Sequence, residues 1–123
     1  MPYKNTRLRA VYKPKDHDDL ATFIDAACGY FTAHGMQVTQ AEPGVKGRTG
    51  TVIKENNFSE LEGVFHYRGA TVTIGRLYWG GEFCGAMEFV SQCHSRRGLE
   101  RLLKTAMKDL GKKTADIAIE RKI

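Results

Sequence analysis

A pair of glycines, Gly80-Gly81, most strongly constrains how this chain can fold, because it joins two runs that both alternate between apolar and polar residues. The runs are ATVTIGRLYW before the turn and EFCGAMEFV after it. Two-residue glycine turns between such runs are typical of β-hairpins, and they fix which residues lie opposite one another. One face of the predicted hairpin pairs Tyr78 with Phe83, Arg76 with Gly85, Ile74 with Met87 and Val72 with Phe89. The other face pairs Trp79 with Glu82, Leu77 with Cys84, Gly75 with Ala86, Thr73 with Glu88 and Thr71 with Val90.

A second turn, Arg68-Gly69, tests this register independently. It would close a hairpin between GVFHY and ATVTIGRLYW. In that hairpin Phe65 joins the row of Val72 and Phe89, and His66 falls on the opposite face. Both turns therefore predict the same apolar face. We expect its residues Phe65, Val72, Ile74, Met87 and Phe89 to form the core under the helices, and the hairpin tip to extend beyond them.

Two segments have the 3.6-residue period of amphipathic helices. The first is DHDDLATFIDAACGYFTAHG, in which Asp16 is the predicted N-cap and Gly35 the predicted stop. Its apolar stripe comprises Leu20, Phe23, Ile24, Ala27 and Phe31. The second is SRRGLERLLKTAMKDLG, with Ser95 as the predicted N-cap and Gly111 as the stop. Its stripe comprises Leu99, Leu102, Leu103, Ala106 and Leu110.

The order of the elements predicts an α+β fold. Alternating runs precede the first helix (TRLRAVYKP), follow the second helix (ADIAIERK), and fill the space between the helices, where MQVTQA and GTVIKE come first. Without the extra hairpin strands the order is βαββαβ, which is the ferredoxin-like pattern. We therefore expect a single α+β domain over residues 1–123, with a ferredoxin-like core, extra antiparallel hairpin strands and both helices on one face of the sheet.

The cysteines and the hydropathy indicate a cellular compartment. Cys28, Cys84 and Cys93 form an odd, sparse set without a CxxC pair, which is typical of a reducing compartment rather than of a disulfide-stabilised secreted domain. The segment MPYKNTRLRA lacks the apolar core of a signal peptide. No run approaches the ~18 apolar residues of a membrane span. These features predict a cytoplasmic protein without membrane association.

No residue pattern in the sequence assigns a reaction. Cys84, Cys93, His94 and His66 are the candidates for metal or nucleophile chemistry, but their spacing matches no zinc motif. Cys93 and His94 are neighbours in sequence, so their side chains would point apart in an extended segment. We therefore expect no metal, no cofactor and no catalytic residue, which favours a non-enzymatic module over an enzyme.

The net charge of +5 favours an anionic partner, and nucleic acid above all. Four cations of the second helix recur at i, i+4, i+7 and i+11 opposite its leucines, and the glycine-rich loop EPGVKGRTGT and the first strand each add two more. A solvated face is the simpler explanation of such a stripe, although the same geometry suits phosphate contacts. We predict a small binding module that contacts RNA or DNA. The predicted contacts are Arg97, Arg101, Lys104, Lys108, Lys46, Arg48, Arg7 and Arg9.

The alternative is a protein-interaction module. Trp79 and Tyr78 at the hairpin tip are residue types enriched in interface hot spots. Arg76 lies in an otherwise apolar row, where it either extends past the helices or pairs with an anion. A subunit, or a small inhibitor such as phages and mobile elements encode, would dock through the tip, a sheet face or an edge strand. Its partner would be an acidic protein or a second copy of the chain.

Overall fold

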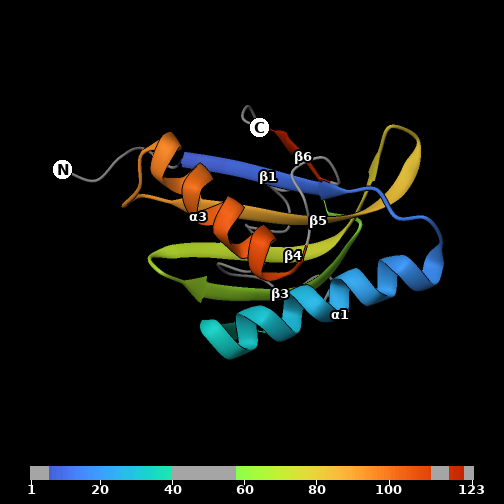
Figure 1. Cartoon of the computed structure of the whole chain (residues 1–123), viewed down its shortest axis with the longest axis horizontal. Helices are drawn as coiled ribbons and strands as arrows, with labels where there is room; N and C mark the ends of the chain where they lie inside the picture. The colour runs from blue at the N-terminus through green and yellow to red at the C-terminus, as the bar shows by residue number, and fades with distance from the viewer. Residues whose placement is uncertain (1–5, 40–57, 112–116, 121–123) are drawn as a thin grey trace.

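The computed structural model describes residues 6–39, 58–111 and 117–120 (Figure 1). Its elements are β1 (Thr6–Tyr12), α1 (His17–His34), β2 (Met36–Thr39), β3 (Glu60–Tyr67), β4 (Ala70–Trp79), β5 (Glu82–Ser91), α3 (Arg96–Asp109) and β6 (Ile117–Glu120). The strands form one sheet in the order β2-β3-β4-β5-β1-β6. Every neighbouring pair in that sheet is antiparallel. The segment GTVIKE, predicted as a further strand, lies outside the described residues.

The predicted α+β class is confirmed, and both helices lie on the same face of the sheet (Figure 1). The predicted ferredoxin-like core is wrong, because the strand order is not the usual one of that topology. In a ferredoxin-like sheet, one strand separates the two strands that flank the first helix. Here α1 leads into β2 at the far edge, and β5, β4 and β3 all lie between β1 and β2.

The register predicted from the two turns is confirmed. Trp79 pairs with Glu82 and the ladder continues without a shift to Thr71 and Val90, while Phe65 pairs with Val72 across the neighbouring hairpin. The central residues of both turns have positive φ values, 49° and 85° for Arg68-Gly69 and 63° and 83° for Gly80-Gly81. Two consecutive residues with positive φ give the backbone twist that matches paired antiparallel strands.

The predicted helix ends are also found. The Asp16 carboxylate accepts a hydrogen bond from the Asp19 backbone N–H at 2.8 Å, and the Ser95 hydroxyl accepts one from the Gly98 backbone N–H at 3.1 Å. Each bond satisfies a backbone donor that has no partner within the first turn of its helix. α1 ends at His34, immediately before the predicted stop at Gly35.

The core lies between the helices and the sheet. Aromatic rings dominate one end of it, where the Phe31 ring meets Tyr67 and Phe89 edge to face at centroid distances of 5.0 and 5.9 Å. Nearly all residues of the predicted core are buried, and only Leu110 is half-buried at its margin. The buried predicted residues are Leu20, Phe23, Ile24, Ala27, Phe31, Phe65, Val72, Ile74, Met87, Phe89, Leu99, Leu102, Leu103 and Ala106.

The opposite face of the sheet is not open along its whole length, as a two-layer arrangement would leave it. Phe58, Leu77 and Ala86 form a second buried cluster there, against which Leu61 packs. Glu88, on the same face by the alternation of β5, is fully buried. Within the described residues, no helix is long and apolar enough to cross a membrane.

Candidate functional site

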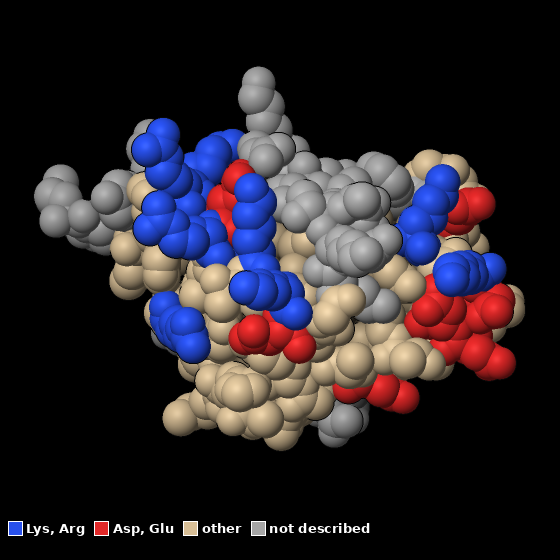
Figure 2. All heavy atoms as spheres, viewed as in Figure 1, with Lys and Arg blue, Asp and Glu red and all other residues tan. Residues whose placement is uncertain are grey.

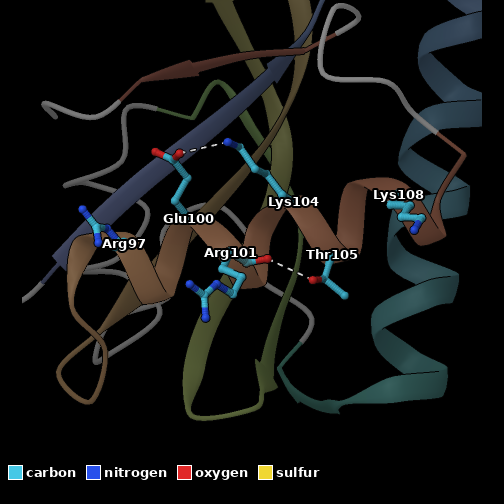
Figure 3. A pocket seen from close by; sticks show the side chains of 6 residues that line it. All are labelled: Arg97, Glu100, Arg101, Lys104, Thr105 and Lys108. Atoms are coloured by element: carbon cyan, nitrogen blue, oxygen red, sulfur yellow. Dashed lines mark hydrogen bonds and ion pairs between the residues drawn. The ribbon is translucent and has the colours of Figure 1, made fainter.

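Helix α3 carries its four predicted cations on one exposed surface. Arg97, Arg101, Lys104 and Lys108 are all exposed, and together they line a shallow hollow of about 350 Å³ (Figure 3). Glu100 and Thr105 complete its described lining. We refer to these six residues as the α3 surface.

The apolar residues of α3 determine which way these cations point. Leu99, Leu103 and Ala106 are fully buried against the sheet, so residues on the other side of the helix must face solvent. Arg97 and Lys108 are eleven positions apart, which corresponds to roughly 16 Å along an α-helix at about 1.5 Å per residue. The result is a straight, rigid row of positive charge.

One carboxylate lies within the row. The Lys104 ammonium is 3.1 Å from a Glu100 carboxylate oxygen, an ion pair between residues one helical turn apart. The Thr105 hydroxyl donates to the Arg101 carbonyl at 3.0 Å and is therefore engaged within the helix (Figure 3). With four cations and one carboxylate, the α3 surface keeps an excess of positive charge.

The first turn of α3 carries positive charge, which is unfavourable for the stability of the helix. Anionic side chains are favourable at a helix N-terminus, where the backbone dipole is positive. α1 follows this preference with Asp18 and Asp19 in its first turn, whereas α3 has no acidic residue there and begins with Arg96 and Arg97. Helix stability alone does not explain cations at this position.

Charge is distributed unevenly over the face that carries the helices. Lys and Arg gather over α3, whereas acidic side chains predominate near the start of α1, at the other end of the molecule (Figure 2). The two ends of this face would therefore interact differently with an anionic partner.

The other predicted nucleic-acid contacts are not part of the α3 surface. Arg7 and Arg9 each approach the buried Glu88 carboxylate at 3.4 Å, on the face of the sheet that points away from the helices. Arg9 lies directly opposite Glu88 in the β1–β5 register. Their charges therefore serve an ion pair within the fold. Lys46 and Arg48 lie outside the described residues.

The predicted hairpin tip presents an aromatic pair. The rings of Tyr78 and Phe83 lie 4.0 Å apart between centroids, and the two residues are 63% and 41% exposed. The backbone of Trp79 pairs with Glu82, and its side chain lies outside the described part of the structure. Beside the tip is a second shallow hollow, which no sequence pattern indicated. It is lined by Pro14, Asp16, His17, Leu20, Glu82 and Phe83.

Arg76 is held by carboxylates of its own chain. Its guanidinium lies 3.7 Å from Glu60 and 3.7 Å from Glu62, and its side chain is 30% exposed. The space above Gly85, across the hairpin, is occupied by Phe23, whose ring a Cβ on Gly85 would overlap. Of the two predicted environments for Arg76, the ion pair is therefore the one observed.

The cysteines and histidines do not converge on a reactive centre. Among the described residues, no three His, Cys, Asp or Glu side chains lie close enough together to hold a metal ion. Ser91 Oγ and His94 Nδ1 are 2.7 Å apart, but the same hydroxyl accepts the Cys93 backbone N–H at 3.0 Å. Ser91 is also buried. This contact, which the sequence did not reveal, stabilises the connection from β5 to α3.

Comparison of the chain with protein-family models, with curated proteins and with solved structures finds no match. The function of the α3 surface must therefore be inferred from its charge and geometry.

Proposed function

We propose that this protein is a small, non-enzymatic binding module of the cytoplasm that contacts nucleic acid through the α3 surface. The observation that supports this proposal is the row Arg97, Arg101, Lys104 and Lys108 on one exposed helix face. Regularly spaced cations on a rigid support suit the regularly spaced phosphates of a nucleic-acid backbone.

Apart from the favourable position of Lys108 in the last turn of α3, the row has little use within the fold. In the part of the chain that the structure describes, Lys104 pairs with Glu100, whereas Arg97, Arg101 and Lys108 make no ion pair. A like-charged pair four residues apart, such as Arg97 and Arg101, destabilises an isolated helix by a few tenths of a kcal/mol. An anionic ligand would relieve this repulsion and would release counterions on binding.

The test is a charge-reversal variant of the centre of the row, Arg101→Glu with Lys104→Glu. Because both side chains are exposed, the variant should unfold at nearly the same temperature as the parent. Its affinity for nucleic acid should fall, and the slope of log affinity against log salt should decrease by about one unit for each phosphate that the variant no longer binds.

The matched control is Lys13→Glu with Lys15→Glu, which changes the net charge by the same amount. Both lysines are exposed and belong to the connection from β1 to α1, at the far end of the molecule from the start of α3 (Figure 1). If the control and the α3 variant weaken binding equally, only net charge matters and the proposed site is wrong. If the parent shows no salt-dependent binding, the proposal as a whole fails.

A second candidate function is protein interaction through the hairpin tip, supported by the exposed, stacked rings of Tyr78 and Phe83. Exposed aromatic residues beside a shallow hollow are typical anchors of protein interfaces. The partner would be an acidic protein or a second copy of the chain. The test is a pull-down from the native cell with the parent and with a Tyr78→Ala, Phe83→Ala variant. If the parent captures a protein that the variant does not, the hairpin tip is a protein-binding site. If the variant instead loses nucleic acid, the tip belongs to the nucleic-acid interface.

A further inference from the structure

We infer that the ligand of the α3 surface is double-stranded DNA, with α3 lying along the major groove and its cations on the flanking phosphates. This inference rests on the proposed function and narrows it from nucleic acid in general to one form. Three features of the described residues carry it: the chemistry of the lining, the shape of the support, and the location of the exposed aromatics.

The lining of the hollow disfavours an unpaired strand. Its described residues are four cations, one carboxylate and one threonine, with no aromatic ring among them. Proteins that bind single strands without sequence preference combine a basic groove with aromatic side chains on which the exposed bases stack. A surface that offers only charge should bind a duplex more tightly than a single strand. In a duplex the bases are already stacked and paired, and the phosphates are dense, at one per ~1.7 Å of helix axis.

The exposed aromatics that could stack on bases lie elsewhere. Tyr78 and Phe83 belong to the β4–β5 hairpin tip, which projects at the opposite end of the molecule from the start of α3 (Figure 1). The charge view shows the same separation, with the basic cluster over α3 and a mixed, largely acidic region at the other end (Figure 2). A strand bound along α3 would therefore not run onto this aromatic pair.

The shape of the support favours DNA over RNA. An α-helix with its side chains is roughly 10–12 Å in diameter, and the major groove of B-form DNA is about 12 Å wide and admits such a helix. The major groove of duplex RNA is too narrow and deep for side chains to enter. α3 turns its apolar side to the sheet and leaves the side with Arg97, Arg101 and Lys108 exposed, so this side of the helix can face a groove.

The experiment is fluorescence anisotropy with three labelled probes of equal length and mixed sequence: duplex DNA, duplex RNA and single-stranded DNA. At one fixed salt concentration the parent protein should bind duplex DNA at least about tenfold more tightly than either other probe, because only that probe combines high charge density with an open major groove. The preference should vanish in the Arg101→Glu, Lys104→Glu variant and persist in the Lys13→Glu, Lys15→Glu control.

The outcomes separate this inference from the proposed function. Equal or tighter binding of single-stranded DNA or duplex RNA, still abolished in the α3 variant, overturns the duplex-DNA inference and leaves the proposed function in place. Binding that the α3 variant retains in full, or no binding of any probe, overturns both. In the last case an acidic protein becomes the remaining candidate for the α3 surface.

Discussion

The Tyr30 hydroxyl donates to the Asp109 carboxylate at 2.8 Å and so connects the C-terminal part of α1 to the last residue of α3. The same hydroxyl lies 2.9 Å from that of Tyr67 on β3. Because the Tyr30 proton is committed to Asp109, Tyr67 is the donor of the second bond. The two bonds join both helices and the sheet at one point, and they fix the orientation of α3 and of its basic side.

Tyr30→Phe should therefore destabilise the fold by about 1–3 kcal/mol, since it removes a bond to a carboxylate and a bond to a hydroxyl. Burial, the Tyr67 hydroxyl and the Asp109 carboxylate raise the pKa of Tyr30 above the usual tyrosine value. A raised pKa in the folded state stabilises the fold below about pH 10 and loses that effect as the pH rises further. Chemical denaturation should show that the free energy of unfolding declines between pH 8 and 11, and that this decline is smaller in Tyr30→Phe than in the parent. Tyr78 is exposed, so the control variant Tyr78→Phe should change neither the free energy of unfolding nor its dependence on pH.

Phe89→Ala should cost about 3–5 kcal/mol of unfolding free energy, because it removes a fully buried ring and leaves a cavity. Phe83→Ala is the matched control. Because Phe83 is 41% exposed, this substitution should lower the free energy of unfolding by less than about 1 kcal/mol. Urea denaturation measures both. Equal effects of the two substitutions would show that the register of β5 is not as described.

Glu88→Gln should destabilise the protein strongly, by about 3–5 kcal/mol, because it removes a fully buried carboxylate that forms ion pairs with Arg7 and Arg9. Glu100→Gln removes a carboxylate from the partly exposed pair with Lys104 and should cost less than about 1 kcal/mol. Thermal denaturation of the two variants, which carry the same chemical change, compares the buried pair directly with the partly exposed one. A Glu88→Gln protein as stable as Glu100→Gln would contradict the buried ion pair.

Arg97→Glu should change stability and binding in opposite directions. A carboxylate near the N-terminus of α3 interacts favourably with the helix dipole, so the variant should be more stable by about 0.5–1 kcal/mol while binding nucleic acid less tightly. Lys108→Glu, in the last turn, should weaken binding as well but lower stability. Melting temperature and anisotropy on the same two proteins check this pattern. A less stable Arg97→Glu variant would contradict the view that this arginine serves binding at the expense of the helix.

The three cysteines should differ in reactivity. Burial, with Glu62 and Asp25 nearby, raises the pKa of Cys28 to about 11, and burial raises the pKa of Cys84 as well. Cys93 is exposed. Because the thiolate is the reactive form, iodoacetamide at pH 8 should modify Cys93 alone in the folded protein and all three after denaturation. Mass spectrometry of the intact protein counts the additions, and rapid labelling of Cys28 in the native state would contradict its burial.

The sequence was sufficient to predict the hairpin register and the helix ends, because these depend on local chemistry. Arg68-Gly69 and Gly80-Gly81 fix the pairing of their own strands, and Asp16 and Ser95 cap the helices that follow them. The strand order was not predictable in this way. The position of β2 at the far edge depends on how a strand docks on partners distant in sequence, and no turn or cap encodes that choice.

The same distinction applies to the candidate site. The α3 cations share one helix, so their spacing alone placed them on one surface. Arg7 and Arg9 look equally basic in the sequence, but β1 pairs with β5 and brings them to Glu88. The pairing joins residues about eighty positions apart, and for this reason the sequence could not show that these charges are used internally.

The placement of β1 between β5 and β6 also has a consequence for the order of events on the ribosome. β1 is synthesised early, but it cannot pair with β5 until the ribosome has made Glu88, which lies 81 residues after Arg7. The β3–β4–β5 meander, by contrast, closes through two short turns and can assemble as soon as it is synthesised. We expect the nascent chain to hold a preformed meander and to admit β1 only afterwards. Until β1 pairs, the side chains of Leu8 and Ala10, which are fully buried in the folded protein, stay exposed to solvent, where they can contact other unfolded chains or chaperones.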